Sequence, residues 1–113
     1  MVEQRQEWND KVIYLIADEY GSVQLELYKD VQDFGGTAWL WDLFVLPGHR
    51  RKGHAKRLLK RAEEAARRDG HKSVFLEWCA KDSPSWVLDW YGRQGYETRE
   101  IGSGYIILEK RFV

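Results

Sequence analysis

The residues best suited to chemistry lie in the short segment 48–56, Gly-His-Arg-Arg-Lys-Gly-His-Ala-Lys. It precedes residues spaced as in an amphipathic helix, so its backbone N–H groups gather at a helix start. Unpaired N–H groups and the positive end of the helix dipole bind phosphate at such a place. Gly53 allows close approach to the backbone, and the neighbouring Arg and Lys side chains add positive charge. The segment therefore predicts a site for phosphate or pyrophosphate.

Two familiar phosphate-binding loops do not match this segment. Gly48 and Gly53 have the spacing of a Walker A motif, but that motif continues with Lys and Ser or Thr, where this chain has His54 and Ala55. The G-x-G-x-x-G pattern of dinucleotide-binding folds is absent. An ordinary solvated helix start is the alternative interpretation.

Composition excludes several classes of protein. The 18 basic and 18 acidic residues give a net charge of zero, so no overall field attracts nucleic acid. Nine Lys and Arg residues nevertheless lie between 49 and 68, a block that suits nucleic acid, a membrane surface or one compact polyanion. No apolar run approaches the roughly 18 residues of a membrane span, and residues 1–10 lack the apolar stretch of a secretory signal. We expect a cytoplasmic protein with a single domain over residues 1–113.

Other reactive side chains give weaker signals. The single cysteine, Cys79, excludes an intrachain disulfide and is interpreted as a buried thiol. The three histidines lack the spacing of metal ligands, so no metal is expected. Aromatic faces and carboxylates that alternate along the chain suit a cationic amine, although core packing is the simpler use of Trp. These residues are Trp39, Trp41, Asp42, Glu77, Trp78, Asp82, Trp86, Asp89 and Trp90.

Hydrophobic periodicity places these residues on an α/β (α+β) frame. Apolar runs and alternation predict strands at 11–18, 23–28, 37–46, 73–79, 96–101 and 105–112. One helix begins near Ala55 and ends before Gly70, which suits the left-handed residue just past the helix, and a second, with Ser83 as N-cap and Pro84 at the first position, runs to about Gln94. The order β-β-β-α-β-α-β-β indicates a mixed central sheet with helices on both faces.

Two segments resemble the signatures of the GNAT superfamily of N-acetyltransferases. Arg50-x-x-Gly53-x-Ala55, preceded by Leu43-Phe44-Val45-Leu46-Pro47, is similar to the family's acetyl-CoA signature, Gln/Arg-x-x-Gly-x-Gly/Ala. Trp90-Tyr91-Gly92-Arg93-Gln94-Gly95-Tyr96 is similar to its aromatic-Tyr-x-x-x-Gly-aromatic motif. Together, on this element order, the resemblance covers residues 12–112.

The resemblance implies a coenzyme A-binding protein with acetyl-CoA as cosubstrate. By position, Leu43, Phe44 and Val45 border the pantetheine, and the amides of Leu43 and Val45 serve pantetheine and the acetyl carbonyl. The pyrophosphate would be held by the loop residues Arg50, Arg51, Lys52, Gly53, His54, Ala55 and Lys56. The basic block thereby gains a small-molecule ligand, and we expect neither nucleic acid nor a membrane as partner.

The resemblance also implies direct acetyl transfer to a primary amine in a ternary complex. A neutral amine attacks the thioester, a backbone N–H stabilises the oxyanion, and an acid protonates the departing thiolate. Tyr91 matches the position of that acid. The family's Glu is Trp41 here, so Asp42 is the nearest substitute as general base, with Glu77 as a second candidate. Strand alternation separates Trp41 from Asp42 unless a bulge re-aims one of them.

Two departures from the family pattern leave alternatives open. The family's N-terminal strand and two helices, which wall the acceptor site, are not expected in ten polar residues, so that side should be open or closed by a partner subunit, as in a homodimer. Pro84 stands where an Asn often begins the second helix. A catalytically inactive protein that binds CoA or another protein, and a nucleic-acid-binding protein, are the alternative functions. The acceptor amine, whether a small molecule, a protein lysine or an N-terminus, is not identified by the sequence.

Overall fold

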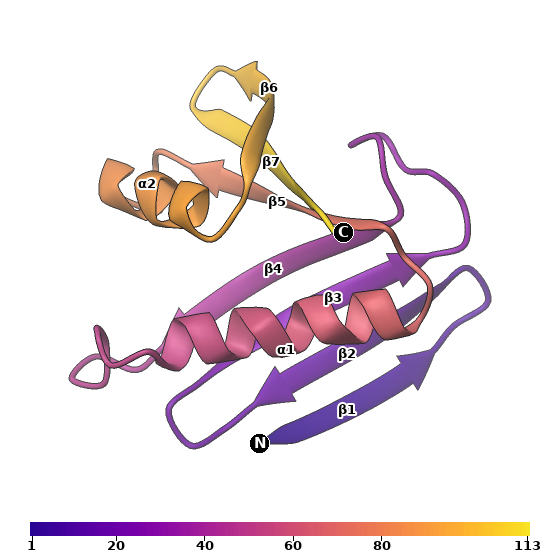
Figure 1. Cartoon of the computed structure of the whole chain (residues 1–113), viewed down its shortest axis with the longest axis horizontal. Helices are drawn as coiled ribbons and strands as arrows, with labels where there is room; N and C mark the ends of the chain where they lie inside the picture. Colours follow the sequence, from indigo (N-terminus) through magenta and orange to yellow (C-terminus); the bar gives the residue numbers. More distant parts are fainter.

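The computed structural model describes residues 1–113, which form one seven-stranded sheet and two helices (Figure 1). The elements are β1 (Val2–Glu7), β2 (Lys11–Ala17), β3 (Gly21–Tyr28), β4 (Ala38–Val45), α1 (His54–Arg68), β5 (Ser73–Cys79), α2 (Ser85–Arg93), β6 (Glu97–Gly102) and β7 (Tyr105–Arg111). The strand order is β1-β2-β3-β4-β5-β7-β6. Only β4 and β5 pair in parallel, and α1 forms the crossover between them. The expected α+β class with a mixed sheet is confirmed.

Strand β1 was not expected, because every residue of it after Val2 is polar. It pairs antiparallel with β2 over its whole length, and only residues 8–10 connect the two strands. Glu3 faces α1 and accepts hydrogen bonds from Arg61 at 3.1 Å and Arg68 at 3.2 Å. The expectation that no strand precedes residue 11 is therefore wrong, while no helix stands between β1 and β2. Pairing and ion pairs, rather than apolar alternation, keep this edge strand in place.

Both helices pack on the same face of the sheet, which corrects the expected placement on two faces. Buried residues alternate along the strands, as in Ile16 of β2, Leu40 of β4 and Leu76 of β5, and they form one cluster with the apolar side of α1. Leu88 and Tyr91 of α2 pack against this same cluster. The core is consequently a single layer of side chains between the sheet and the two helices.

The predicted features of α1 are confirmed, whereas the predicted start of α2 is not. The buried side of α1 holds the predicted positions Leu58, Leu59, Ala62, Ala65 and Ala66, and the glycine after the helix, residue 70, has a φ of 92°. Pro84, not Ser83, is the N-cap residue of α2, and no side chain caps that helix. The expected Ser83 cap is thus wrong.

The opposite face of the sheet carries no helix. Part of it is covered by the loop between β3 and β4, where the Phe34 ring lies 4.7 Å from Trp39 and 5.2 Å from Phe75. Leu15 and Trp41 remain 36% and 37% exposed on strands that are otherwise central. No helix is long and apolar enough to cross a membrane.

Candidate active site

Strands β4 and β5 separate shortly after they meet. Their one parallel pair is Trp39 with Phe75. Beyond it, β4 contains a bulge, where its register against β3 shifts and Asp42 has a φ of 52°. The bulge bends β4 away from its parallel neighbour, so the backbone around Leu43 is not paired with β5. This opening is where the sequence predicts the acetyl and pantetheine groups.

Gly21 is required at the start of β3 because β4 passes very close. A Cβ atom at position 21 would lie 2.2 Å from the carbonyl oxygen of Phe44 and 3.1 Å from the Cα of Val45. Any larger residue would push β4 outward at the point where the bulge has already displaced it. Gly21 therefore maintains the shape of the opening, a role that the sequence alone did not indicate.

The loop after β4 presents a continuous row of free backbone donors. None of the seven amides of residues 50–56 donates a hydrogen bond within the protein. Arg51 and Gly53 have φ values of 63° and 84°, and Gly53 is the N-cap of α1. The first turn of α1 contains no acidic residue, and no side chain caps it. Such a cradle of N–H groups at a helix start has the donors and the dipole that suit an anion.

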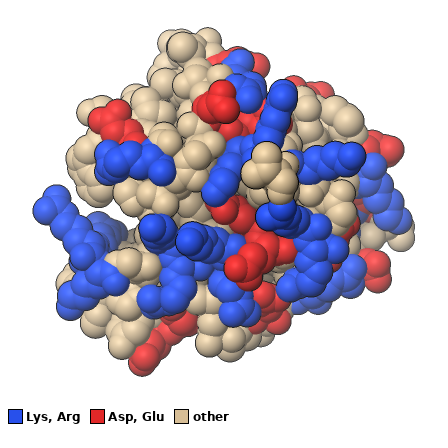
Figure 2. All heavy atoms as spheres, viewed as in Figure 1, with Lys and Arg blue, Asp and Glu red and all other residues tan.

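The basic side chains of this loop are mostly without acidic partners. Figure 2 shows Lys and Arg gathered over α1 and the loop that precedes it. Lys52 and Lys56 make no ion pair. Arg50 instead turns back to β4, where its Nε donates to the Val45 carbonyl at 2.9 Å and its guanidinium lies 5.6 Å from the Phe44 ring. Arg50 thus holds the loop against β4 through its side chain.

Arg51 connects the loop to α2. Its guanidinium lies 5.9 Å from the ring centroid of Trp86, which is 55% exposed in the first turn of α2. A cation–π contact therefore joins the loop that follows β4 to the first turn of α2. The sequence analysis named Trp86 among the aromatic residues that suit a cationic amine, but it contained no signal for this pairing, because the two residues are far apart in the chain.

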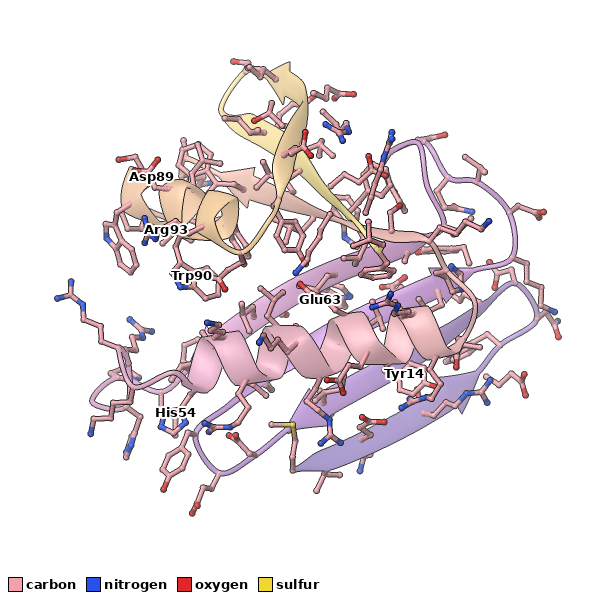
Figure 3. The ribbon with its side chains drawn as sticks, in the orientation of Figure 1. Tyr14, His54, Glu63, Asp89, Trp90 and Arg93 are labelled. Atoms are coloured by element: carbon pink, nitrogen blue, oxygen red, sulfur yellow. The ribbon has the colours of Figure 1, made fainter.

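His54 belongs to an aromatic stack beneath the loop (Figure 3). Its ring stacks on Tyr20 at 4.3 Å, and His49 lies 4.8 Å from the same Tyr20 ring. Asp18 anchors this turn by accepting from the amides of Tyr20 at 2.8 Å and Gly21 at 3.0 Å. The β2–β3 turn thereby supports the anion-binding loop from below.

Tyr91 lies on the side of α2 that faces the core. Its ring contacts Trp90 at 5.1 Å and Tyr96 at 5.6 Å, both edge-on. Its hydroxyl makes no protein hydrogen bond, and no fully buried side-chain polar atom lacks a partner, so this hydroxyl reaches solvent. Burial raises the pKa of Tyr91 to about 12. The phenol therefore keeps its proton at neutral pH and has a free hydrogen bond to donate.

Glu63, a buried acidic residue of α1, holds Tyr96, whose ring lies against Tyr91. Glu63 is 9% exposed, accepts from the Tyr96 hydroxyl at 2.8 Å, and pairs with the Lys110 ammonium at 3.0 Å. Figure 3 shows Glu63 and Trp90 between α1 and α2. The backbone amide of Tyr96 also donates to the Tyr91 carbonyl at 3.1 Å. Through these bonds α1 holds the segment that carries Tyr91.

The two candidate bases occupy different positions at the opening. Trp41 and Glu77 each lie two residues beyond the Trp39–Phe75 pair, on the uncovered face. Glu77 is exposed and makes no ion pair or hydrogen bond. Asp42 is also exposed at the bulge, whereas the next residue, Leu43, packs on the core. The bulge that the alternation argument required is therefore present, and the catalytic assignment of Asp42 stays a prediction.

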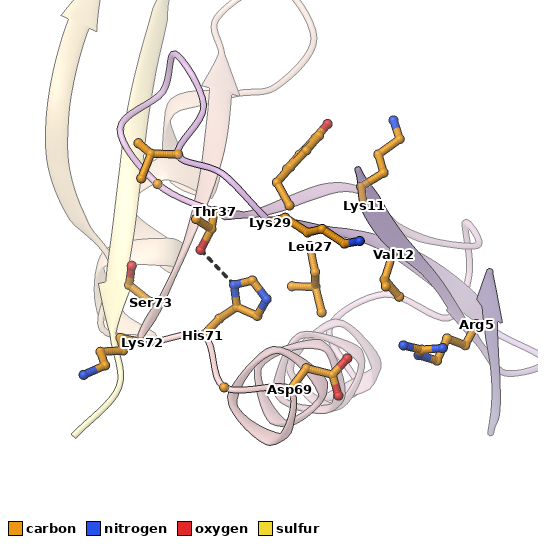
Figure 4. A pocket seen from close by; sticks show the side chains of 14 residues that line it. Arg5, Lys11, Val12, Leu27, Lys29, Thr37, Asp69, His71, Lys72 and Ser73 are labelled. Carbon is orange, nitrogen blue, oxygen red and sulfur yellow. Dashed lines mark hydrogen bonds between the residues drawn. The ribbon is translucent and has the colours of Figure 1, made fainter. Parts of the chain in front are cut away.

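A separate hollow of about 770 Å³ lies at the other end of α1 (Figure 4). It is lined by the residues that follow α1, from Asp69 to Ser73, and by the β3–β4 loop, and the Nδ1 of His71 lies 2.8 Å from the Thr37 hydroxyl. Two of its basic residues are already paired, Lys11 with Glu26 at 3.2 Å and Arg5 with Glu7 at 3.7 Å. This hollow shares no residue with the opening between β4 and β5.

The fold is shared by solved acetyltransferases that are longer than this chain. The N-acetyltransferase PaiA of Thermoplasma acidophilum, solved with coenzyme A, has a TM-score of 0.70 at 22% identity, covering 91% of this chain and 62% of its own. A GNAT family acetyltransferase of Elizabethkingia anophelis with acetyl-CoA bound has a TM-score of 0.68 at 17% identity, covering 91% and 77%. An acetyltransferase of Streptococcus agalactiae has a TM-score of 0.66 at 18% identity, covering 90% and 67%.

Sequence comparison identifies the family directly. No curated protein shows significant sequence similarity to the chain. The model of the acetyltransferase (GNAT) family, however, matches residues 2–96, which include the anion-binding loop, Tyr91 and most of the sheet. The structural relatives share the fold at low identity, and the family model covers most of the sequence. The chain therefore belongs to the GNAT acetyltransferase family.

Proposed function

We propose that this protein is an N-acetyltransferase that moves the acetyl group of acetyl-CoA to a primary amine by direct transfer. The observation that carries the proposal is the row of free amides from Arg50 to Lys56 at the start of α1. A pyrophosphate supplies acceptors for these donors and negative charge for the helix end. The family match and two relatives with bound coenzyme A or acetyl-CoA support acetyl-CoA as the cosubstrate.

Binding of the pyrophosphate at this loop directs the rest of the cosubstrate into the opening between β4 and β5. The unpaired backbone near Leu43 and Val45 then lies beside the pantetheine and the acetyl carbonyl. A backbone N–H at this bulge would stabilise the oxyanion that forms when the amine attacks the carbonyl carbon. The cleft residues Leu43, Phe44 and Val45 and the loop residues 50–56 are the proposed binding set.

The chemical step requires two proton transfers. The amine nitrogen bonds to the carbonyl carbon, the C–S bond breaks, and the nitrogen loses a proton to a carboxylate or to water held by one. Tyr91 gives its proton, or a hydrogen bond, to the departing sulfur. The same burial that raises the pKa of Tyr91 to about 12 also raises that of a thiol in the cleft, so the two groups stay better matched than their values in water suggest.

The carboxylate that serves the amine is Asp42 or Glu77, and both are free of other partners. Asp42 lies directly on the bulge with an unusual φ of 52°, a conformation that Asp tolerates. Glu77 shares the uncovered face with Trp41, whose indole suits a cationic amine. Comparing Asp42→Asn with Glu77→Gln in steady-state kinetics identifies the base, since only its loss lowers kcat strongly.

The test is release of free CoA from acetyl-CoA in the presence of a panel of primary amines. We expect Tyr91→Phe to lower kcat by about 100-fold with little change in acetyl-CoA affinity. Tyr14→Phe is the matched control, because that hydroxyl bonds Asp69 at 3.1 Å beside the opposite end of α1. Unchanged turnover in Tyr91→Phe would remove Tyr91 from the mechanism.

A protein that binds acetyl-CoA but has no transferase activity is the second candidate. The uncovered acceptor side and the Trp at position 41 favour it. Binding of acetyl-CoA by calorimetry without turnover of any amine in the panel would support this second function. Absence of binding at millimolar acetyl-CoA would exclude both functions.

A further inference from the structure

The uncovered face of the sheet is unusually free of charge over its first four strands. We define the open face as the seven uncharged side chains Gln4, Gln6, Ile13, Leu15, Gln24, Trp39 and Trp41, which the strand registers place opposite the core on the same side as the charged Lys11 and Glu26. Lys11 and Glu26, also on this side, pair with each other at 3.2 Å. An uncharged patch with aromatic and aliphatic side chains is typical of a protein interface.

The molecule also exposes more surface than a folded monomer of its size. Its accessible surface is 7175 Å². A monomer of 13.4 kDa is expected to expose about 6,500 Å². The excess of about 700 Å² is close to the roughly 800 Å² that each partner buries in a standard interface. Because the core fills only one side of the sheet, a partner that covers the other side would remove an area of this order from water.

We propose that the open face is the contact surface of a homodimer in which two copies pack sheet against sheet about a two-fold axis. A two-fold interface brings the same patch of both copies together, so the patch must be complementary to itself. The open face meets this condition, because its seven side chains are uncharged and the neighbouring Lys11 and Glu26 neutralise each other. Its glutamine amides both donate and accept, so they can pair with the same residues of the partner.

The geometry of packed sheets suits these side chains. Two sheets stack about 10 Å apart with interdigitating side chains, and Leu15 and Trp41 project from the centre and the border of the open face. Trp41 lies on both the open face and the opening between β4 and β5. The partner sheet therefore walls the side of the cleft that has no helix, a consequence that rests on the proposed function. The dimer itself does not.

The first test is sedimentation of the protein from about 1 to about 100 µM. We expect twice the monomer mass of 13.4 kDa at the upper end of this range. Leu15→Glu places a carboxylate from each copy within the interface and should weaken dimerisation by at least about 100-fold. Ile101→Glu is the matched control, since Ile101 is 73% exposed on β6, outside the open face, and the variant should remain dimeric.

A second variant tests the same surface independently, in case Leu15→Glu does not fold. Gln24→Lys changes a half-buried polar side chain of the open face and adds a positive charge to the contact surface of each copy. Circular dichroism should show both variants folded, and Gln24→Lys should also dissociate. A monomeric wild-type protein at about 100 µM, or a dimer that both folded variants preserve, would overturn the proposal. Acetyl-CoA binding, measured separately by calorimetry, reports on the proposed function alone.

Discussion

Replacing Gly53 with Glu tests whether the free amides at the start of α1 bind the cosubstrate's pyrophosphate. A Cβ atom at this position would have no heavy atom within 4 Å, so the new side chain extends into open space above the loop. A carboxylate about 5 Å from one phosphate charge costs between about 1 and 3 kcal/mol, depending on the local dielectric. With two phosphates nearby, acetyl-CoA affinity should fall by at least about 30-fold.

Gly70→Glu is a close control for the backbone and the charge. Gly70 has a φ of 92°, near the 84° of Gly53, and its Cβ would also meet nothing within 4 Å. Both substitutions therefore strain the backbone by roughly 1 kcal/mol. The two sites lie beyond opposite ends of the 15-residue α1, which is about 22 Å long, so their separation exceeds the range of unscreened charge. Gly70→Glu should bind acetyl-CoA like the wild type.

The helix dipole predicts that the variant with the weaker acetyl-CoA affinity, Gly53→Glu, is the more stable of the two. A carboxylate is favourable at the N-terminus of α1 and unfavourable at its C-terminus, by about 0.3–1 kcal/mol each. Gly53→Glu should therefore unfold at a higher temperature than Gly70→Glu, while only Gly53→Glu loses cosubstrate. Titration calorimetry and thermal denaturation measure the two quantities. Equal acetyl-CoA affinity in Gly53→Glu and the wild type, or an equal loss in both variants, would refute the reasoning.

Two further predictions concern stability. Glu63→Gln should lower the free energy of unfolding by about 1–3 kcal/mol in denaturant, because it leaves the Lys110 ammonium beside Tyr96 without its charge partner. The control is Glu64→Gln on the exposed side of α1, which should change the free energy of unfolding by less than about 0.5 kcal/mol. For Glu109, burial alone would raise the pKa, but hydrogen bonds and charges of neighbouring arginines lower it overall from 4.5. Its ionised form therefore stabilises the fold above pH 4.5, and this contribution is lost as the pH falls through the lowered pKa. The difference in unfolding free energy between wild type and Glu109→Gln should shrink below pH 4.5, and a difference independent of pH would contradict this assignment.

Local sequence patterns determined the parts of this protein that depend on near neighbours. The spacing of Leu58 with its neighbouring apolar residues specifies α1, because a helix repeats every 3.6 residues. The loop at 50–56 was recognisable as a candidate anion site, since a helix start with glycine and basic residues has the same chemistry in any fold. The two motifs around Gly53 and Tyr91 indicated the family that the comparison confirms.

The tertiary structure decided everything that depends on pairing between distant segments. Polar β1 becomes a strand because β2 offers a partner and α1 offers Arg61 and Arg68 for Glu3. Both helices lie on one face, because they pack against one apolar side of the strands, and this leaves the open face uncovered. The bulge at Asp42 arises from the register of β4 against β3, which no short pattern encodes. Periodicity shows which residues share a face, but only packing decides what lies opposite that face.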